Sequence, residues 1–264
     1  MKIGFIGCGN MATAMLKGIL KSGEVKNADM IASAKSDKTR EKIEKELGIQ
    51  KADTNAQVVD FADVVFLAVK PQFLEEVLDE IKDNVKEGQI FISIAPGKTL
   101  QWLGEHLGEG TKIIRTMPNT PAMVGEGMTA LCVNEQVTEQ EKLLAVTLCN
   151  TFGKSEVIPE HLMDAVVGVS GSSPAYVFMF LEAMADAAVA DGMPRAQAYK
   201  FAAQAVLGSA KLMLETGKHP GELKDMVCSP AGTTIQAVRV LEEKGLRSAV
   251  IEAQTACVKK AKEM

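Results

Sequence analysis

The first 158 residues alternate between short apolar runs and longer stretches in which apolar residues recur every three or four positions. The short runs predict buried strands at Lys2–Ile6, at a segment ending near Ser33, and at Asp63–Val69, Gln89–Ile94, Lys112–Arg115 and Met128–Val133. The longer stretches predict a helix that Gly23 closes, and helices at Asp37–Leu47, Pro71–Ile81, Thr99–Leu107 and Thr138–Thr151. Alternation of this kind predicts an α/β Rossmann domain with a doubly wound, mostly parallel sheet.

After Ile158 the strand signals end, and the spacing predicts helices at Glu160–Val169, Pro174–Ala190, Pro194–Thr216, Glu222–Val227, Thr233–Lys244 and Arg247–Glu263. The second of these is small and apolar nearly all round, so we expect it to be buried on most sides. A helical region of this size gains most by packing against a second copy of itself. We therefore expect a Rossmann domain at residues 1–158, an all-α dimerisation domain at 159–264, and a homodimer.

Composition narrows the class of protein. The 264 residues are 47% hydrophobic and 24% charged, which is ordinary for a soluble globular chain. The net charge of −5 and the scarcity of aromatic residues argue against nucleic acid or an anionic membrane as the main partner. No uninterrupted apolar run reaches about 18 residues, and a strand begins at residue 2, so we expect neither a membrane span nor a signal peptide.

The five cysteines and three histidines are scattered, without metal-ligand spacing. We therefore expect reduced thiols, no metal site and a cytoplasmic location.

A glycine-rich loop follows the first strand and opens the first helix, as Gly7-Cys8-Gly9-Asn10-Met11-Ala12. In this context the spacing predicts a dinucleotide grip, in which Gly7 forms the tight turn and Gly9 lets a pyrophosphate approach the backbone. Ala12 permits close contact between helix and strand. We expect the coenzyme to contact Ile6, Gly7, Cys8, Gly9, Asn10, Met11 and Ala12.

The end of the second strand bears on the choice of coenzyme. NAD-dependent enzymes usually place an acidic residue there to hold the ribose 2′-hydroxyl, whereas this chain has Ser33, followed by Lys35 and Ser36. A neutral hydroxyl next to a cation suits a 2′-phosphate better, so NADP(H) is favoured, with NAD(H) as an alternative. Lys35 is equally compatible with a solvated surface lysine.

Other candidate coenzyme contacts lie where strands end, because ligands of doubly wound sheets bind at that edge. Asn55 is a candidate for the adenosine ribose, with an N-cap as its alternative role. Asn119, after the sixth strand, could bond the nicotinamide carboxamide or merely close a turn. The remaining candidates are Ala68, Val69, Lys70, Pro71, Ile94, Ala95 and Pro96.

A second small-residue loop, Cys228-Ser229-Pro230-Ala231-Gly232-Thr233-Thr234, leads directly into an amphipathic helix. Free backbone N–H groups and the positive end of the helix dipole make such a start a candidate anion site. Thr233 and Gln236 stand at capping-box spacing, as do Thr138 and Glu141. The alternative is an ordinary capped turn between two helices.

The chain has no lysine between Lys154 and Lys200, the region where many two-domain dehydrogenases carry a general base. Gly168-Val169-Ser170-Gly171-Ser172-Ser173-Pro174-Ala175 stands there instead. Oxidation of a hydroxy acid needs a base, whereas a protonated imine already accepts hydride. The missing lysine therefore favours imine reduction.

Together these segments resemble the Δ1-pyrroline-5-carboxylate reductase family. The motifs that carry the resemblance are the glycine loop, Ala68-Val69-Lys70-Pro71-Gln72, Arg115-Thr116-Met117-Pro118-Asn119-Thr120-Pro121, the segment beginning at Gly168, and Ser229–Thr234. The resemblance spans essentially the whole chain. It implies NAD(P)H-dependent reduction of 1-pyrroline-5-carboxylate to L-proline, the last step of proline biosynthesis, by interlocked dimers that often assemble into a decamer.

Site residues also follow from the resemblance. It implies that the substrate carboxylate is held around Ser229, Gly232 and Thr233, that Thr234 bonds the ring nitrogen as the catalytic residue, and that Glu160 lies beside the substrate pocket. Two positions depart from many relatives. Ala231 replaces a glycine, a change expected to matter little, and Met226 stands where some relatives have Asn.

Two rival interpretations stay open. One is a β-hydroxy-acid dehydrogenase of similar two-domain shape, which the missing lysine disfavours. The other is a non-catalytic NADP(H)-sensing protein, which the two intact loops disfavour.

Overall fold

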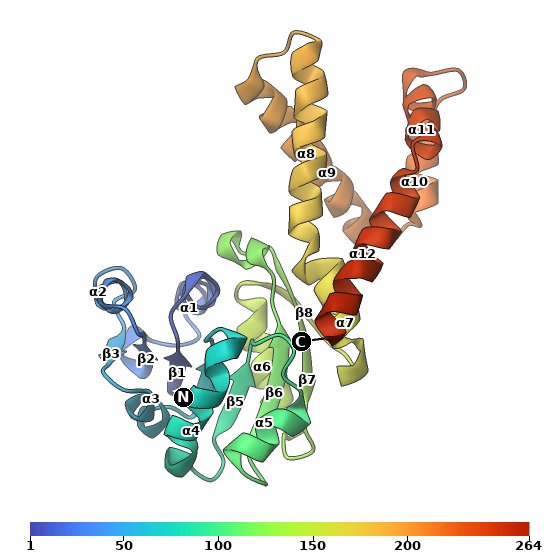
Figure 1. Ribbon diagram of the computed structural model, residues 1–264. Coiled ribbons are helices and arrows are strands. Elements are labelled where there is room, and N and C mark those ends of the chain that lie inside the picture. The colour runs from blue at the N-terminus through green and yellow to red at the C-terminus, as the bar shows by residue number, and fades with distance from the viewer. Residues whose placement is uncertain (264) are drawn as a thin grey trace. The chain divides into compact units, whose positions relative to one another are not determined.

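A single eight-stranded sheet organises the first part of the computed structural model, which describes residues 1–263. Its strands, in spatial order, are β3 (Gln50–Ala52), β2 (Met30–Ser33), β1 (Ile3–Ile6), β4 (Val64–Leu67), β5 (Ile90–Ser93), β6 (Lys112–Met117), β7 (Gly127–Val133) and β8 (Gly153–Val157). Every neighbouring pair is parallel except β6 and β7. This is the doubly wound, mostly parallel sheet predicted from the pattern (Figure 1).

Helices cover both faces of the sheet. The helices α1 (Asn10–Ser22), α2 (Asp37–Lys45) and α6 (Glu139–Asn150) pack on one face, and α3 (Asn55–Phe61), α4 (Leu74–Ile81) and α5 (Leu100–Leu107) on the other. The inner strands are buried on both faces, so they appear in the sequence as continuous apolar runs.

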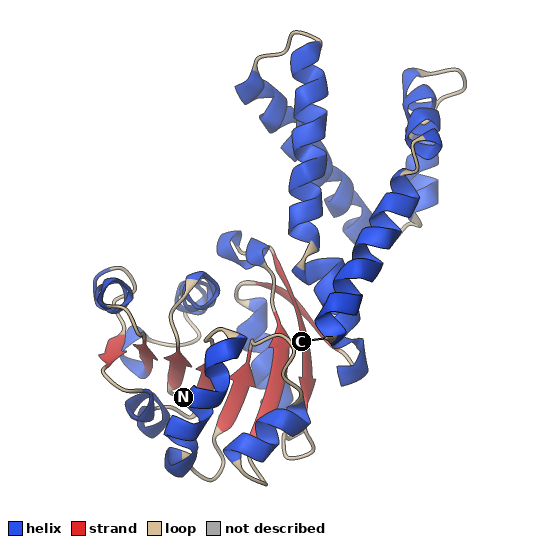
Figure 2. Cartoon of the chain, in the orientation of Figure 1, coloured by secondary structure: helices blue, strands red, loops and turns tan. Residues whose placement is uncertain are grey.

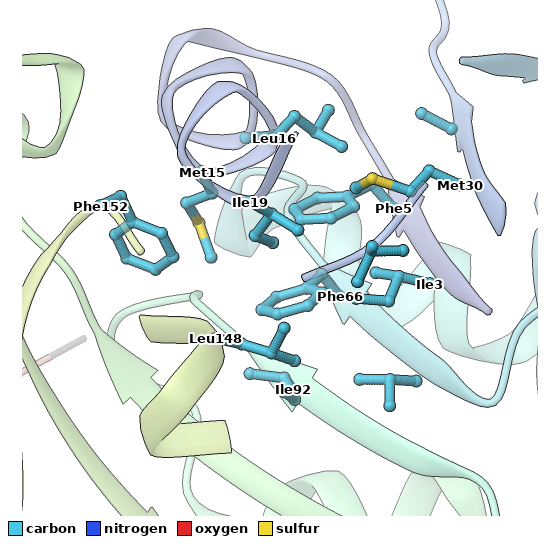
Figure 3. Packing of buried hydrophobic residues seen from close by; sticks show 14 of the residues in the cluster. Ile3, Phe5, Met15, Leu16, Ile19, Met30, Phe66, Ile92, Leu148 and Phe152 are labelled. Atoms are coloured by element: carbon cyan, nitrogen blue, oxygen red, sulfur yellow. The ribbon is translucent and has the colours of Figure 1, made fainter. Parts of the chain in front are cut away.

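The two faces have separate cores, because successive strand residues point to opposite sides. Phe5 and Phe66 stack at 4.4 Å between ring centroids, in one cluster with Met15 and Ile19 of α1 (Figure 3). Both phenylalanines are fully buried, and each such ring contributes about 1.5–3 kcal/mol. This core fixes α1, and with it the loop that opens α1.

From residue 158 to 263 the described chain is helical, as predicted (Figure 2). The short helix α7 (Met163–Val166) is followed by a π-helical turn at Val167–Gly171. The remaining helices are α8 (Ser173–Ala190), α9 (Arg195–Thr216), α10 (Pro220–Met226), α11 (Thr233–Glu243) and α12 (Leu246–Lys262). Gly217 closes α9 in the left-handed conformation at φ 63°, and Pro194 is the N-cap of that helix.

By their internal contacts the residues form two compact units. One comprises Met1–Ser172 together with the chain from Cys257 onward, and the other Ser173–Ala256. We call these the sheet unit and the helical unit. The domain bounds 1–158 and 159–264 stay a prediction.

The stretch Glu160–Ala190 is long and apolar enough, by length and composition, to pass as a membrane-spanning helix. Asp164, Glu182 and Asp186 interrupt it. A helix that packs against protein on several sides has the same composition.

Candidate functional site

Four parallel strands end in register at one edge of the sheet. Ile6 at the end of β1 pairs with Ser33 of β2 and with Leu67 of β4, and Leu67 pairs with Ser93 of β5. The loops that follow these strands contain most of the predicted coenzyme contacts. Because these strands are parallel, the loops after them lie at the same edge, which is where ligands bind doubly wound sheets. The predicted contacts in these loops are Cys8, Lys35, Ala68, Val69, Ile94, Ala95 and Pro96.

The glycine loop has the backbone geometry of an anion cradle. Gly7 adopts φ +92°, and a Cβ there would lie 2.7 Å from the carbonyl oxygen of Ala68, so only glycine fits. Its N–H donates to the carbonyl of Ser33 at 3.1 Å, which ties the loop to β2.

Gly9 is the N-cap of α1, with no side-chain hydrogen bond at the cap and no acidic residue in the first turn. A Cβ added to Gly9 would meet no atom within 4 Å. A ligand therefore has room beside Gly9, and the first N–H groups of α1, which no side chain at the cap binds, fit a pyrophosphate. Asn10 and Met11 form the exposed and half-buried first positions of α1, while Ala12 is buried against the sheet, as predicted.

At the end of β2, Ser33 is buried and its hydroxyl donates to Oδ1 of Asn55 at 2.6 Å. Asn55 in turn donates from Nδ2 to the Glu80 carboxylate at 2.6 Å. Asn55 is not the N-cap of α3, because Thr54 caps that helix by accepting the N–H of Gln57. The sequence thus misassigned the alternative role of Asn55 and missed Glu80, while a coenzyme contact of Asn55 stays a prediction.

Lys35 and Ser36, the next two candidates for contact with the coenzyme, have partners close by in the chain or the fold. The exposed Lys35 ammonium lies 5.4 Å from the centre of the Phe73 ring. Ser36 is the N-cap of α2 and accepts the N–H of Thr39 at 3.2 Å. Lys70 is exposed, and Pro71 opens a short 3₁₀ turn before α4.

Asn119 is buried, and both ends of its side chain are engaged. Its Oδ1 accepts the N–H of Met128 at 2.8 Å, and its Nδ2 donates to the carbonyl of Ser170 at 3.0 Å. These bonds fix the loop after β6 against the strand and the π-helical turn. The geometry favours the structural alternative, and a coenzyme contact would have to use the remaining amide proton or the second lone pair of Oδ1.

Glu160 accepts two hydrogen bonds on one oxygen. Oε1 takes the N–H of Leu100, the first residue of α5, at 2.8 Å and Nη1 of Arg115 at 3.0 Å. Arg115 lies within β6 with 8% of its side chain exposed, whereas 32% of Glu160 is exposed. Glu160 is therefore anchored within the sheet unit. No sequence signal pointed to this partner, because Arg115 and Glu160 lie 45 positions apart.

Burial keeps the nearby thiols protonated. The pKa of Cys132 is raised to about 12, chiefly by burial and also by the charge of Glu160, while Arg115 opposes the change. The pKa of Cys8 is also raised, chiefly by burial, although Thr13 and Lys42 oppose this. All five cysteines are free, as expected, and those two thiols are poor nucleophiles. Among residues 1–263, no three His, Cys, Asp or Glu side chains are placed to hold a metal ion.

The second loop turns into α11 without a side-chain cap. Gly232 is the N-cap and its N–H donates to the carbonyl of Ser229 at 3.0 Å. Thr233 and Thr234 are the first two helical residues, so the predicted capping box of Thr233 with Gln236 is wrong. The box of Thr138 with Glu141 is confirmed. The difference arises because the extended N-cap position of α11 is Gly232, which has no side chain, and Thr233 already belongs to the helix.

The start of α11 keeps the properties of an anion site. Its first turn contains no acidic residue, and no side chain caps its first N–H groups. The half-buried Thr234 stands beside them. Ala231, before the cap, has φ +59°, the only positive φ of a non-glycine residue among residues 1–263.

Two family models match parts of the chain. Residues 160–264 match the family model "Pyrroline-5-carboxylate reductase dimerisation", and residues 2–97 match "NADP oxidoreductase coenzyme F420-dependent". The chain is 54% identical to pyrroline-5-carboxylate reductase of Escherichia coli, over all of this chain and 98% of that protein.

Solved structures agree with these matches. A pyrroline-5-carboxylate reductase from Coxiella burnetii superposes with a TM-score of 0.93 at 37% identity, over 99% of this chain and 97% of that one. Plasmodium falciparum pyrroline carboxylate reductase with NADP bound gives 0.89 at 30% identity, over 100% and 97% of the two chains.

Proposed function

The chain belongs to the pyrroline-5-carboxylate reductase family, and we propose that this oxidoreductase reduces 1-pyrroline-5-carboxylate to L-proline with NADPH as its preferred reductant. NADH is the alternative. The observation that carries the proposal is the presence of two uncapped helix starts, α1 behind a glycine loop and α11 behind a hydroxyl-rich loop. One suits a dinucleotide pyrophosphate and the other a small carboxylate.

The coenzyme site would be built from the strand edge. The N–H groups that open α1 would bind the pyrophosphate, and Ser33, Lys35 and Asn55 would face the adenosine ribose. When bound, NADPH supplies the hydride for the imine carbon. The known structure of the Plasmodium relative with NADP bound supports this choice of coenzyme.

The substrate site would use the loop before α11. The carboxylate would accept hydrogen bonds from the amides around Gly232 and from the hydroxyls of Ser229 and Thr233. The Thr234 hydroxyl would bond the ring nitrogen. The hydride would add to the carbon of the protonated imine, whose nitrogen already holds its proton, so the step needs no general acid or base. Glu160 would lie beside the pocket. Catalysis by these residues consists of orientation and electrostatic stabilisation.

The assembly would be a homodimer through the dimerisation region, with a decamer of five dimers as the further assembly to test, in the cytoplasm. The match of residues 160–264 to a dimerisation model supports the dimer. Five dimers are suggested only by the family resemblance.

Loss of NADPH absorbance on addition of fresh 1-pyrroline-5-carboxylate, with chiral detection of L-proline, tests the reaction. A parallel run with NADH measures the preference. Activity on 3-hydroxy acids with NADP⁺ would instead favour the dehydrogenase rival. NADPH binding without turnover of either substrate class would favour the sensing rival.

The role of Thr234 has its own test. We expect Thr234→Ala to lower turnover by roughly 10- to 1000-fold, the loss of one positioned hydrogen bond, with nearly unchanged NADPH affinity. Thr255→Ala is the matched control, because the Thr255 hydroxyl bonds the Ile251 carbonyl within α12. Normal turnover of Thr234→Ala would remove this hydroxyl from the chemistry.

A further inference from the structure

A hydrogen-bonded chain of three side chains lies at the end of β2, where the ribose of a bound dinucleotide would meet the protein. Ser33 donates to Asn55 at 2.6 Å, and Asn55 donates to Glu80 of α4 at 2.6 Å. The main-chain N–H of Asn55 also donates to the other oxygen of Glu80, at 3.3 Å. Glu80 thus holds Asn55 by two bonds.

The carboxylate determines which way the Asn55 amide points. A carboxylate only accepts hydrogen bonds, so the NH₂ end of Asn55 must face Glu80, and Oδ1 is left to face Ser33. The single proton of the Ser33 hydroxyl is then committed to Asn55. One amide proton of Asn55 is committed to Glu80.

What remains on this chain is mostly acceptor capacity. Ser33 keeps lone pairs, Asn55 keeps one lone pair and one proton, and Glu80 keeps its negative charge. A ribose 2′-hydroxyl can donate to such a surface. A 2′-phosphate cannot donate, and its negative charge is repelled by the carboxylate.

We propose that Glu80 is a specificity-determining residue that acts through Asn55 and Ser33 to limit the preference for a 2′-phosphate, and so keeps the site open to NADH. Enzymes that use NAD place a carboxylate at the end of the second strand itself. In this chain Glu80 of α4 supplies the carboxylate, and the Asn55 side chain would stand between that carboxylate and the ribose. Lys35 favours the phosphate and Glu80 opposes it, so the coenzyme preference is the difference between them.

This inference rests on the coenzyme site proposed above, and its test measures binding without turnover. Calorimetric titrations of adenosine 2′,5′-bisphosphate and of 5′-AMP give the affinity ratio for a nucleotide with and without the 2′-phosphate. NADP⁺ and NAD⁺ are then titrated in the same way. We expect Glu80→Gln to raise the phosphate preference about tenfold, the size of one charge-assisted hydrogen bond.

Asp79→Asn is the matched control, since Asp79 is the preceding residue of α4 and bonds Lys82 at 3.2 Å. It removes the same charge from the same helix but leaves the bonds of Asn55 in place, so we expect a change below about twofold. Glu80→Ala is a second variant and should shift the ratio in the same direction as Glu80→Gln. Thermal unfolding verifies that the exposed position tolerates each change.

An unchanged ratio in both Glu80 variants would overturn the inference, and so would an equal shift in Asp79→Asn, because the effect would then be general charge. In either case intact binding of NADP⁺ leaves the proposed function standing. Failure of the unsubstituted protein to bind either dinucleotide would overturn both.

Discussion

The sheet unit and the helical unit solve the problem of burying apolar surface in different ways. The sheet unit encloses two cores, with side chains such as Phe5, Phe66 and Phe91 fully buried. In the helical unit the fully enclosed residues are alanines, Ala185, Ala198 and Ala202. Its large side chains stay outside: Phe178 is 63% exposed, Phe201 67% and Leu214 84%.

This difference shows which part of the molecule is complete as a single chain. A soluble monomer rarely exposes contiguous apolar surface of this extent. The match of residues 160–264 to a dimerisation model explains what covers it. The sheet unit therefore folds around its own core, whereas we expect the helical unit to bury its apolar face against a second copy.

A charge placed on the helical face would break the comparison most severely. We expect Phe201→Glu to abolish the dimer and to lower stability by about 3–5 kcal/mol, because an interface would then bury an unpaired carboxylate. Light scattering reports the mass, and chemical unfolding at several protein concentrations reports the stability.

Leu143→Glu is the matched control. Leu143 is 60% exposed on α6 of the sheet unit, and we expect a change within about 0.5 kcal/mol there. If both variants stay oligomeric and equally stable, the apolar face of α9 is not an interface.

The ion pair of Arg115 with Glu160 in the sheet unit can be compared with an exposed ion pair in the helical unit, with a smaller expected effect on stability. We expect Arg115→Met to cost about 2 kcal/mol, since Glu160 loses a hydrogen bond to a charged group at a largely buried position. The exposed pair of Lys211 with Glu215, 3.5 Å apart on α9, supplies the control, and Lys211→Met should change stability by no more than about 0.5 kcal/mol.

Urea unfolding of both variants measures the difference. Equal costs would mean that the buried pair contributes no more than a solvated one. Because Glu160 is expected beside the substrate, KM for 1-pyrroline-5-carboxylate in Arg115→Met also tests whether anchoring Glu160 matters to binding.

The sequence was most informative where burial is continuous. The inner strands β1, β4 and β5 are buried at every position, so their apolar runs predicted them. The outer strands β3 and β8 escaped prediction because Gln50–Ala52 has one buried residue and Gly153–Val157 none. Edge strands leave no apolar run to detect.

Site residues followed the same rule. Gly7 and Gly9 were predictable because their roles depend on the local backbone and on the adjacent strand and helix. The partnership of Arg115 with Glu160 joins residues 45 positions apart, and that of Asn55 with Glu80 joins residues 25 apart. Such pairs have no local signal, since only the folded sheet brings them together.

The glycine loop and the loop before α11 also differ in backbone strain. In the glycine loop the left-handed position is Gly7, whereas the loop before α11 places Ala231 at φ +59°. The left-handed conformation costs alanine about 1–2 kcal/mol, and glycine loses about 0.5–1 kcal/mol more backbone entropy on folding.

The expectation that alanine matters little here can therefore be replaced by a prediction of the direction in which stability changes. Ala231→Gly should stabilise the protein by about 0.5–1 kcal/mol. Ala237→Gly within α11 should destabilise it by about 1 kcal/mol. Parallel urea unfolding compares the two, and a loss of stability in both variants would show that Ala231 is unstrained.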